Sequence, residues 1–318
     1  MAVPASLKKN LRFPAVAAPM FLVSGPELVL ATCKSGMIGT FPALNQRTTE
    51  GYVAWLNEIE SGLGPDDAAY GVNLIVHNTN TRLQADLTVT VEHEVPLVIT
   101  SLGAVRDVVD AVHSYGGVVF HDIINARHAQ KAMEAGVDGL ILVSSGAGGH
   151  AGNQHPFALI HEIRSFFKGT ILLSGAQSTG SDVAAALMAG ADLGYMGTRF
   201  IATPEARAQD EYKQMLVDSG ASDITYTDAI SGIHANFLTP SLIQNGLDPA
   251  AAKDPHHKIN MDQELNTEAK AWKTIWSAGQ GVGSIHEVLP VADLVASLRA
   301  EYETAHTEFA TKSGLYGL

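Results

Sequence analysis

The sequence predicts a (β/α)₈ barrel with a small, mostly helical lobe inserted after the eighth strand. Eight short apolar runs alternate with helix-like segments at a repeat of about 25 residues, the size of one strand–helix unit. The runs are apolar throughout, which is typical of parallel strands buried on both faces. This repeat ends near residue 203. The number of charged residues also rises there, from 6 of the 65 residues in 139–203 to 17 of the 73 in 203–275. A doubly wound Rossmann sheet is the alternative fold.

These observations divide the chain into two parts. Residues 1–203 and 276–318 are expected to form the barrel, and residues 204–275 the lobe that covers the active site. The expected strands begin near Val16, Ile38, Tyr70, Leu97, Gly117, Asp138, Thr170 and Leu193.

Local signals place several of the intervening helices. Pro26 opens one, because proline is favoured at the first helical position. The segments Ala126–Ala135 and Ser181–Ala189 are each followed by a glycine that can end a helix, and Ser181 is the expected cap of the second. A last amphipathic helix after Pro290, running to about Phe309, is the expected eighth barrel helix.

Composition excludes several classes of function. The 318 residues carry a net charge of −13, which disfavours binding to nucleic-acid phosphates. The one cysteine, Cys33, lies in an apolar run and is expected to be a buried helix residue. No run of 18 apolar residues or signal-peptide core is visible, so we expect a cytoplasmic protein without a membrane partner. The scattered histidines predict no metal site.

In a barrel, active residues lie at the C-terminal ends of the strands. The ends of the seventh and eighth strands, Ser174–Gln177 and Met196–Thr198, are rich in glycine. Loops at these two positions commonly bind a phosphate through backbone N–H groups, and the Thr198 hydroxyl adds a donor. The alternative is that these glycines only shape turns.

The end of the sixth strand is the most informative, because His150 lies among Gly146, Gly148, Gly149 and Gly152. The dinucleotide motif requires an acidic residue about 20 positions later, and none is present there. We expect this accessible imidazole to titrate near neutrality and to act as a catalytic base. The alternative is a loop histidine bonded to the backbone. His77 could line the substrate pocket, whereas His128 is expected to be structural.

At these strand ends the chain resembles the nitronate monooxygenase family, FMN-dependent barrel enzymes formerly called 2-nitropropane dioxygenases. The matching segments are Ala18-Pro19-Met20, Gly71-Val72-Asn73, Ala147-Gly148-Gly149-His150, Gly190-Ala191-Asp192, Gly197-Thr198-Arg199-Phe200 and Gly279-Gln280-Gly281. Flavin-dependent enoyl reductases and quinone reductases share these motifs. The match covers nearly the whole chain.

The resemblance implies FMN as cofactor and His150 as catalytic base. The residues implied to bind the cofactor are Pro19, Met20, Asn73, His121, Gly148, Gly149, Ser174, Gly175, Ala176, Met196, Gly197, Thr198, Gln280 and Gly281. The chain departs from many relatives at Gly146, where they have glutamate, and at Asp122, where some have lysine. It also has Gly175-Ala176-Gln177 in place of the commoner Gly-Gly-Ile.

The expected activity is therefore oxidation of alkyl nitronates or nitroalkanes by O₂ to a carbonyl compound and nitrite. One alternative is an NAD(P)H-dependent reductase acting on quinones or enoyl thioesters, and another is a flavin-binding sensory protein without turnover. The expected partners are the small-molecule substrate and oxygen, and a homodimer is left open.

Overall fold

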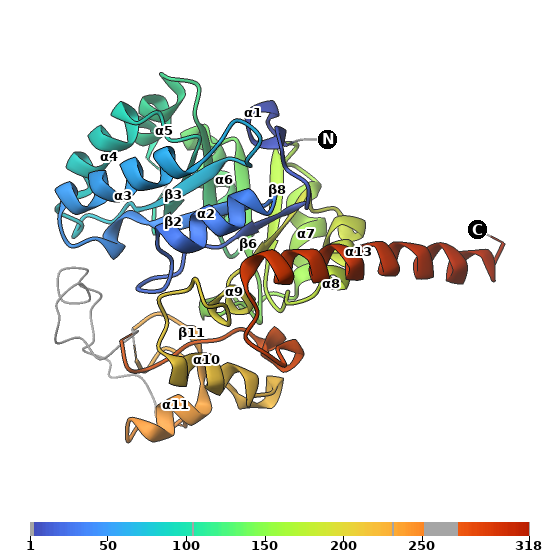
Figure 1. Cartoon of the computed structure of the whole chain (residues 1–318). Helices are drawn as coiled ribbons and strands as arrows, with labels where there is room; N and C mark the ends of the chain where they lie inside the picture. Colours follow the sequence, from blue (N-terminus) through green and yellow to red (C-terminus); the bar gives the residue numbers. More distant parts are fainter. Residues whose placement is uncertain (1–2, 104, 231, 251–272, 318) are drawn as a thin grey trace.

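The computed structural model describes residues 3–103, 105–230, 232–250 and 273–317. Its main body is a closed barrel of eight parallel strands inside a layer of helices (Figure 1), which confirms the predicted fold class. The barrel closes where β9 pairs with β1, so the Rossmann alternative is wrong. The barrel strands are β1 (Ala15–Ala17), β2 (Ile38–Pro42), β3 (Tyr70–Ile75), β4 (Leu97–Ser101), β5 (Val118–Ile123), β6 (Gly139–Val143), β8 (Thr170–Ser174) and β9 (Leu193–Met196).

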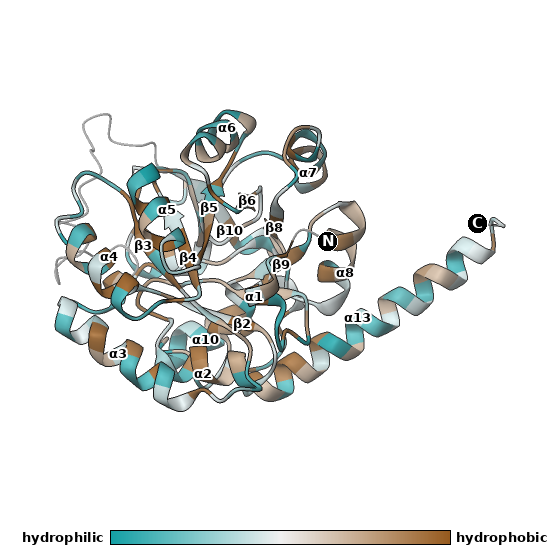
Figure 2. Cartoon of the chain, turned by 90° about the horizontal axis from the view of Figure 1, so that it is seen from above, coloured by the Kyte–Doolittle hydropathy of each residue, from teal (hydrophilic) through white to brown (hydrophobic). Residues whose placement is uncertain are grey.

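Eight helices form the outer layer of the barrel. They are α2 (Pro26–Lys34), α3 (Thr49–Gly62), α4 (Leu83–Glu92), α5 (Arg106–His113), α6 (Ala126–Ala135), α7 (Pro156–Arg164), α8 (Gly180–Ala189) and α13 (Val291–Gly314). The last of these packs against α8 and α2 and so completes the ring as the expected eighth helix, while its C-terminal half projects beyond the barrel (Figure 2). Three short elements, α1 (Ala5–Lys8), η1 (Ala43–Asn45) and α9 (Thr198–Ile201), complete this part of the chain.

Helix ends follow the local signals with one correction. Gly136 and Gly190 end α6 and α8 in the left-handed conformation, with φ of 93° and 114°. The N-cap of α8 is Thr179 rather than Ser181: its side chain accepts from the backbone of Asp182, whose carboxylate accepts from the Thr179 N–H in return. Cys33 is fully buried in α2, as predicted, and burial raises the pKa of its thiol to about 12.

Strand alternation separates two apolar layers. Side chains such as Ile99, Phe120 and Ile141 fill the barrel interior, whereas their neighbours along the strands, such as Val98 and Val119, pack outward against the helices. The next inward-facing residues along the strands lie above this interior layer, at the C-terminal end of the barrel. These positions include Ser101 and Asp122.

In the part that the structure describes, the lobe has two strands beside its helices. It contains α10 (Asp210–Val217), η2 (Ala221–Asp223), β10 (Ile224–Thr227), β11 (Ala235–Leu238) and α11 (Thr239–Gln244), and η3 (Gln280–Ser284) packs beside it. The two strands were not predicted from the sequence. They form a sheet with β7 (Gly149–His150), a short strand from the loop that follows β6. Residues 251–272 of the expected lobe lie outside the described residues.

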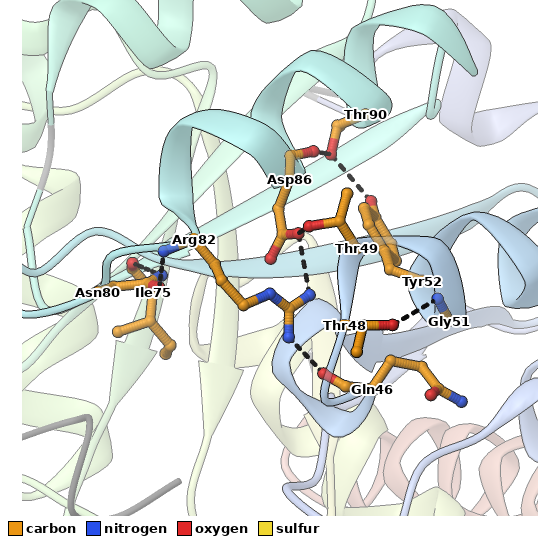
Figure 3. Close-up of polar contacts among 10 residues, drawn as sticks. All are labelled: Gln46, Thr48, Thr49, Gly51, Tyr52, Ile75, Asn80, Arg82, Asp86 and Thr90. Carbon is orange, nitrogen blue, oxygen red and sulfur yellow. Dashed lines mark hydrogen bonds and ion pairs between the residues drawn. The ribbon is translucent and has the colours of Figure 1, made fainter.

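A network of hydrogen bonds connects the loops that follow β2 and β3 (Figure 3). The Arg82 guanidinium donates to the Gln46 carbonyl and, at 2.9 Å, to Asp86 Oδ1, which also accepts from Thr49 Oγ1 at 3.1 Å. Burial raises the pKa of Asp86, and the hydrogen bond and charge of Arg82 oppose that shift. The network fixes the start of α4 against α3 at the same end of the barrel as the strand ends considered next.

Candidate active site

A cavity of about 800 Å³ lies at the C-terminal ends of the barrel strands. It brings together most of the residues singled out from the sequence. Those that line it are Pro19, Met20, Asn73, His121, Gly148, Gly149, His150, Ser174, Gly175, Ala176, Gly197, Thr198 and Gly281. The strand-end rule therefore located the cavity.

Three expected positions lie outside the cavity lining. The Met196 side chain is fully buried in the apolar core, on the opposite side of β9 from Tyr195. The Gln280 side chain is exposed, although its backbone N–H donates to the Gly146 carbonyl at 2.9 Å. His77 is bonded to Thr79 Oγ1 at 2.8 Å and does not line the cavity.

The ends of β8 and β9 form one side of the cavity. Gly175 and Ala176 both have positive φ, 132° and 55°, and they turn the chain sharply after β8. Thr198 Oγ1 accepts from the Gly279 N–H at 2.9 Å, which leaves its own hydroxyl proton available to donate. Ser178 Oγ is buried and has no hydrogen-bond partner among the described residues. The lining of this side is thus rich in donors.

Glycines allow the segment at Gly279–Gly281, which follows the lobe, to lie directly on the loop that follows β6. A Cβ atom at Gly148 would lie 2.8 Å from the Gly279 nitrogen, and one at Gly279 would lie 2.5 Å from the Gly146 carbonyl oxygen. A Cβ atom at Gly281 would lie 2.6 Å from Ser178 Oγ. Contacts this short leave no room for a side chain, so these glycines set the spacing of one cavity wall.

His150 is held by the lobe rather than by the barrel alone. In the antiparallel pair of β7 and β11, His150 lies opposite Ala235 and Gly149 opposite Asn236. The Asn236 side chain donates to the Ala147 carbonyl at 2.7 Å, in a buried position. The backbone of the histidine is therefore fixed by a three-stranded sheet that spans the two parts of the chain.

The cavity floor carries a directed chain of hydrogen bonds across β3, β4 and β5. Asn73 Nδ2 donates to Ser101 Oγ at 2.8 Å and to the Ile99 carbonyl at 3.2 Å, and Ser101 Oγ donates to Asp122 Oδ2 at 2.5 Å. Asp122 shares the inward face of β5 with Phe120. His121 also lines the cavity, although it lies on the opposite face of β5, where its Nδ1 is bonded to Thr100 Oγ1 at 2.8 Å.

The whole barrel and lobe match a single family model. Residues 5–301 match the model described as nitronate monooxygenase. The chain belongs to the nitronate monooxygenase family. This is a family of flavin-dependent oxidoreductases, so the resemblance read from the strand ends is confirmed.

The curated relatives of this chain are named for different activities. A nitronate monooxygenase of Paraburkholderia phytofirmans is 28% identical, with 91% of this chain and 92% of the relative aligned. A (3aS,4S,5R,7aS)-5-hydroxy-7a-methyl-1-oxo-octahydro-1H-indene-4-carboxyl-CoA dehydrogenase of Rhodococcus jostii is 26% identical over 74% of this chain and 65% of its own length.

Solved structures share the fold. A nitroalkane oxidase from Streptomyces ansochromogenes superposes with a TM-score of 0.80 at 24% identity, over 96% of this chain and 100% of the other. FabK from Thermotoga maritima gives a TM-score of 0.81 at 20% identity, over 96% and 97%. At these identities the likeness establishes the barrel architecture alone.

The structure corrects one expectation about the family's candidate base. Burial lowers the pKa of the His150 imidazole to about 4, instead of leaving it near neutrality. The ring is half-buried rather than openly accessible. At neutral pH it is therefore an uncharged base, and an imidazolium that holds an anion is not its resting state.

Several residues that line the cavity were not singled out from the sequence. They include Phe21, Ser101, Leu102, Ile124, Ser178, Tyr195, Tyr212 and Lys131, together with His128, which was expected to be structural. The strand-end rule could have found Ser101, the last residue of β4. The signal for Lys131 and His128 was their place on the first turns of the helix after β5.

The described part of the chain has neither a candidate metal-binding cluster nor a candidate membrane-spanning helix. No group of three or more His, Cys, Asp or Glu side chains in that part could hold a metal ion. No helix there is both long and apolar enough to cross a membrane.

Proposed function

We propose that the protein is an FMN-dependent enzyme that oxidises alkyl nitronates with O₂ to a carbonyl compound and nitrite. The observation that carries the proposal is the convergence, in one cavity, of the glycine-rich ends of β8 and β9 with an uncharged His150. Membership of the nitronate monooxygenase family supports it.

The donor side of the cavity fits a flavin phosphate. The residues proposed to hold it are Ser174, Gly175, Ala176, Gly197 and Thr198. Ser178 Oγ, buried without a partner among the described residues, adds a hydroxyl that a phosphate oxygen would satisfy. Pro19, Met20, Asn73 and Gly149 would lie along the ring system, and Gly281 would close over it. When bound, the flavin supplies the electron-accepting chemistry.

His150 is proposed as the base for neutral nitroalkanes. Deprotonation at the carbon beside the nitro group moves a proton to a ring nitrogen and leaves the nitronate anion. An imidazole with a pKa of about 4 is unprotonated throughout the neutral range, although its burial limits its strength as a base. The chain has a net charge of −13 and as a whole does not attract anions. The charge of the nitronate must therefore be offset locally, by the proton on the His150 ring.

A visible spectrum and an oxygen electrode test the proposal. The purified protein should show a flavin spectrum, and acid release followed by chromatography should yield FMN. A panel of alkyl nitronates should consume oxygen and release nitrite in steady turnover. Recovery of FAD, folded protein that binds no flavin, or flavoprotein that releases no nitrite would each overturn it.

A reductase is the second candidate, because the relatives include a protein named as a carboxyl-CoA dehydrogenase and the neighbours include FabK. NAD(P)H would then reduce the flavin, and a quinone or an enoyl thioester would be the acceptor. Rapid bleaching of the flavin by NAD(P)H without oxygen favours this function, whereas bleaching by a nitronate alone favours the oxidase.

A further inference from the structure

The hydrogen-bonded chain on the cavity floor has a fixed direction. The amide of Asn73 is oriented by its bond to the Ile99 carbonyl, which only accepts, so the group facing Ser101 is the donating Nδ2. The single hydroxyl proton of Ser101 is then left for Asp122 Oδ2 at 2.5 Å. Oδ2 is therefore an acceptor in this chain, and a proton held by the carboxyl group must be on Oδ1.

Asp122 Oδ1 has no compensating partner in the described part of the chain. The atom is buried and has no hydrogen-bond partner there. The carboxylate makes no ion pair among the described residues, and its neighbour on β6, Ile141, is apolar. Desolvation raises the pKa of Asp122 to about 6, and the hydrogen bond from Ser101 only partly offsets this. The pKa of the group thus lies only about one unit below neutral pH.

Other titratable groups lie around Asp122 in the same cavity. Tyr195 on β9 lines the same cavity, but burial and the charge of Asp122 raise its pKa far above the neutral range, so it stays protonated. His121, on the same strand, points to the other face and has a pKa lowered to about 4. His150 on β7 is likewise uncharged. Lys131 and His128 on α6 are exposed members of the lining.

We propose that Asp122 is a second proton-holding residue of the cavity, which takes up a proton on Oδ1 when negative charge arrives there. The charge comes with an anionic ligand or with electrons delivered to the bound flavin, so the inference rests on the proposed function for its physiological setting. Asp122 lines the cavity, and a second negative charge in this poorly solvated space disfavours its ionised form. The incoming proton is supplied by solvent and keeps the charge of the cavity constant.

The test compares Asp122→Asn with the wild-type FMN protein. Asparagine keeps the size of the side chain and an oxygen to accept from Ser101, but it cannot titrate. The pH dependence of the flavin midpoint potential gives the protons taken up on reduction, and the wild type should take up more protons than the variant between about pH 6 and pH 8, by up to about one near pH 7. Asp110→Asn, at an exposed position on α5, is the matched control and should behave as wild type.

Infrared spectroscopy gives a second readout that needs no flavin. Saturating nitrite should increase the carbonyl band of a protonated carboxylic acid in the wild type and in Asp110→Asn, but not in Asp122→Asn. Equal proton uptake by wild type and Asp122→Asn, or no band that depends on Asp122, overturns the inference. Failure to bind FMN would instead overturn the proposed function, and the nitrite measurement would still decide the role of Asp122.

Discussion

The two walls of the cavity are built in different ways. The wall at the ends of β8 and β9 comes from adjacent strands of one barrel, and glycines and a threonine shape it. The wall that carries His150 comes from a two-residue strand, β7, which is held by a strand of the lobe more than 80 residues away. The barrel wall should therefore govern cofactor binding, and the β7–β11 wall the placement of the base. The predictions below test this division.

The largest expected effect comes from His150→Asn. This change should lower activity on neutral nitroalkanes by about 10²–10⁴-fold, the usual contribution of a positioned acid–base group. The loss on pre-formed nitronates should be smaller, because their proton is already gone. FMN should stay bound, since the β8 and β9 ends are untouched. Steady-state rates of nitrite release measure both losses.

The exposed His161 on α7 supplies the control for that experiment. His161→Asn should leave both rates unchanged. Equal, small losses on the two substrates in His150→Asn would show that His150 only supports the loop, and the base would have to be sought elsewhere.

A carboxylate at Gly197 should damage the other wall. Gly197 has a φ of −106°, and the atoms nearest to a Cβ atom there would be those of Ala18 and Met20 at 3.7–3.8 Å, so a Cβ atom fits without strain. Repulsion between Gly197→Asp and the phosphate costs about 1–4 kcal/mol at 4 Å, which weakens FMN binding roughly 5- to 10³-fold. Titration of the apoprotein with FMN, followed by fluorescence, measures the loss.

Gly197→Ala is the matched variant, because it adds the Cβ atom without the charge. It should keep FMN affinity close to wild type. If Gly197→Asp also keeps full affinity, the phosphate lies at another part of the cavity.

Removing the side chain of Asn236 should affect the β7–β11 wall without affecting the wall at the ends of β8 and β9. Asn236→Ala leaves the buried Ala147 carbonyl without its donor, which costs about 1–3 kcal/mol. Because the lost bond joins β11 to the loop before β7, kcat should fall several-fold while FMN affinity is retained. Thr225→Ala on β10 removes a hydroxyl contact to Thr239 at the start of α11, away from that loop, and should leave kcat unchanged. A parallel loss of FMN from Asn236→Ala would contradict the division.

The sequence could predict the barrel wall better than the β7–β11 wall for physical reasons. Barrel strands pair with neighbours in a repeating pattern, so apolar runs and the strand-end rule located the cavity. The strands β10 and β11 have four residues each, and β7 has two. They lie outside the repeat of strand and helix that reveals the equally short barrel strands β1 and β9. The pairing of β7, β10 and β11 depends on contacts distant in sequence that no local pattern reveals.

The same physics explains why adjacent positions of one strand could not be told apart from the sequence. The run Val118–Ile123 is buried on both faces and carries no alternation that would tell His121 from Asp122, and both residues line the cavity. The structure gives the inward position to Asp122. In β9 it likewise buries Met196 in the core, whereas Gly197 lines the cavity.

The smallest expected effect is in the pH profile, and it tests whether the β7–β11 wall sets the protonation of His150. With a pKa of about 4, the ring is almost wholly neutral at both pH 7 and pH 6. The rate of proton abstraction from a nitroalkane should then change by less than about twofold between these values, and it should fall only as the pH approaches the pKa, because protonation removes the base. With the ordinary pKa of about 6.5, roughly three-quarters of the rings would be protonated at pH 6, and the rate would fall about threefold over the same interval. The measurement belongs in the Asp122→Asn background, since Asp122 has its own pKa of about 6. A threefold fall there would mean that the sheet does not keep His150 desolvated when the cavity is loaded.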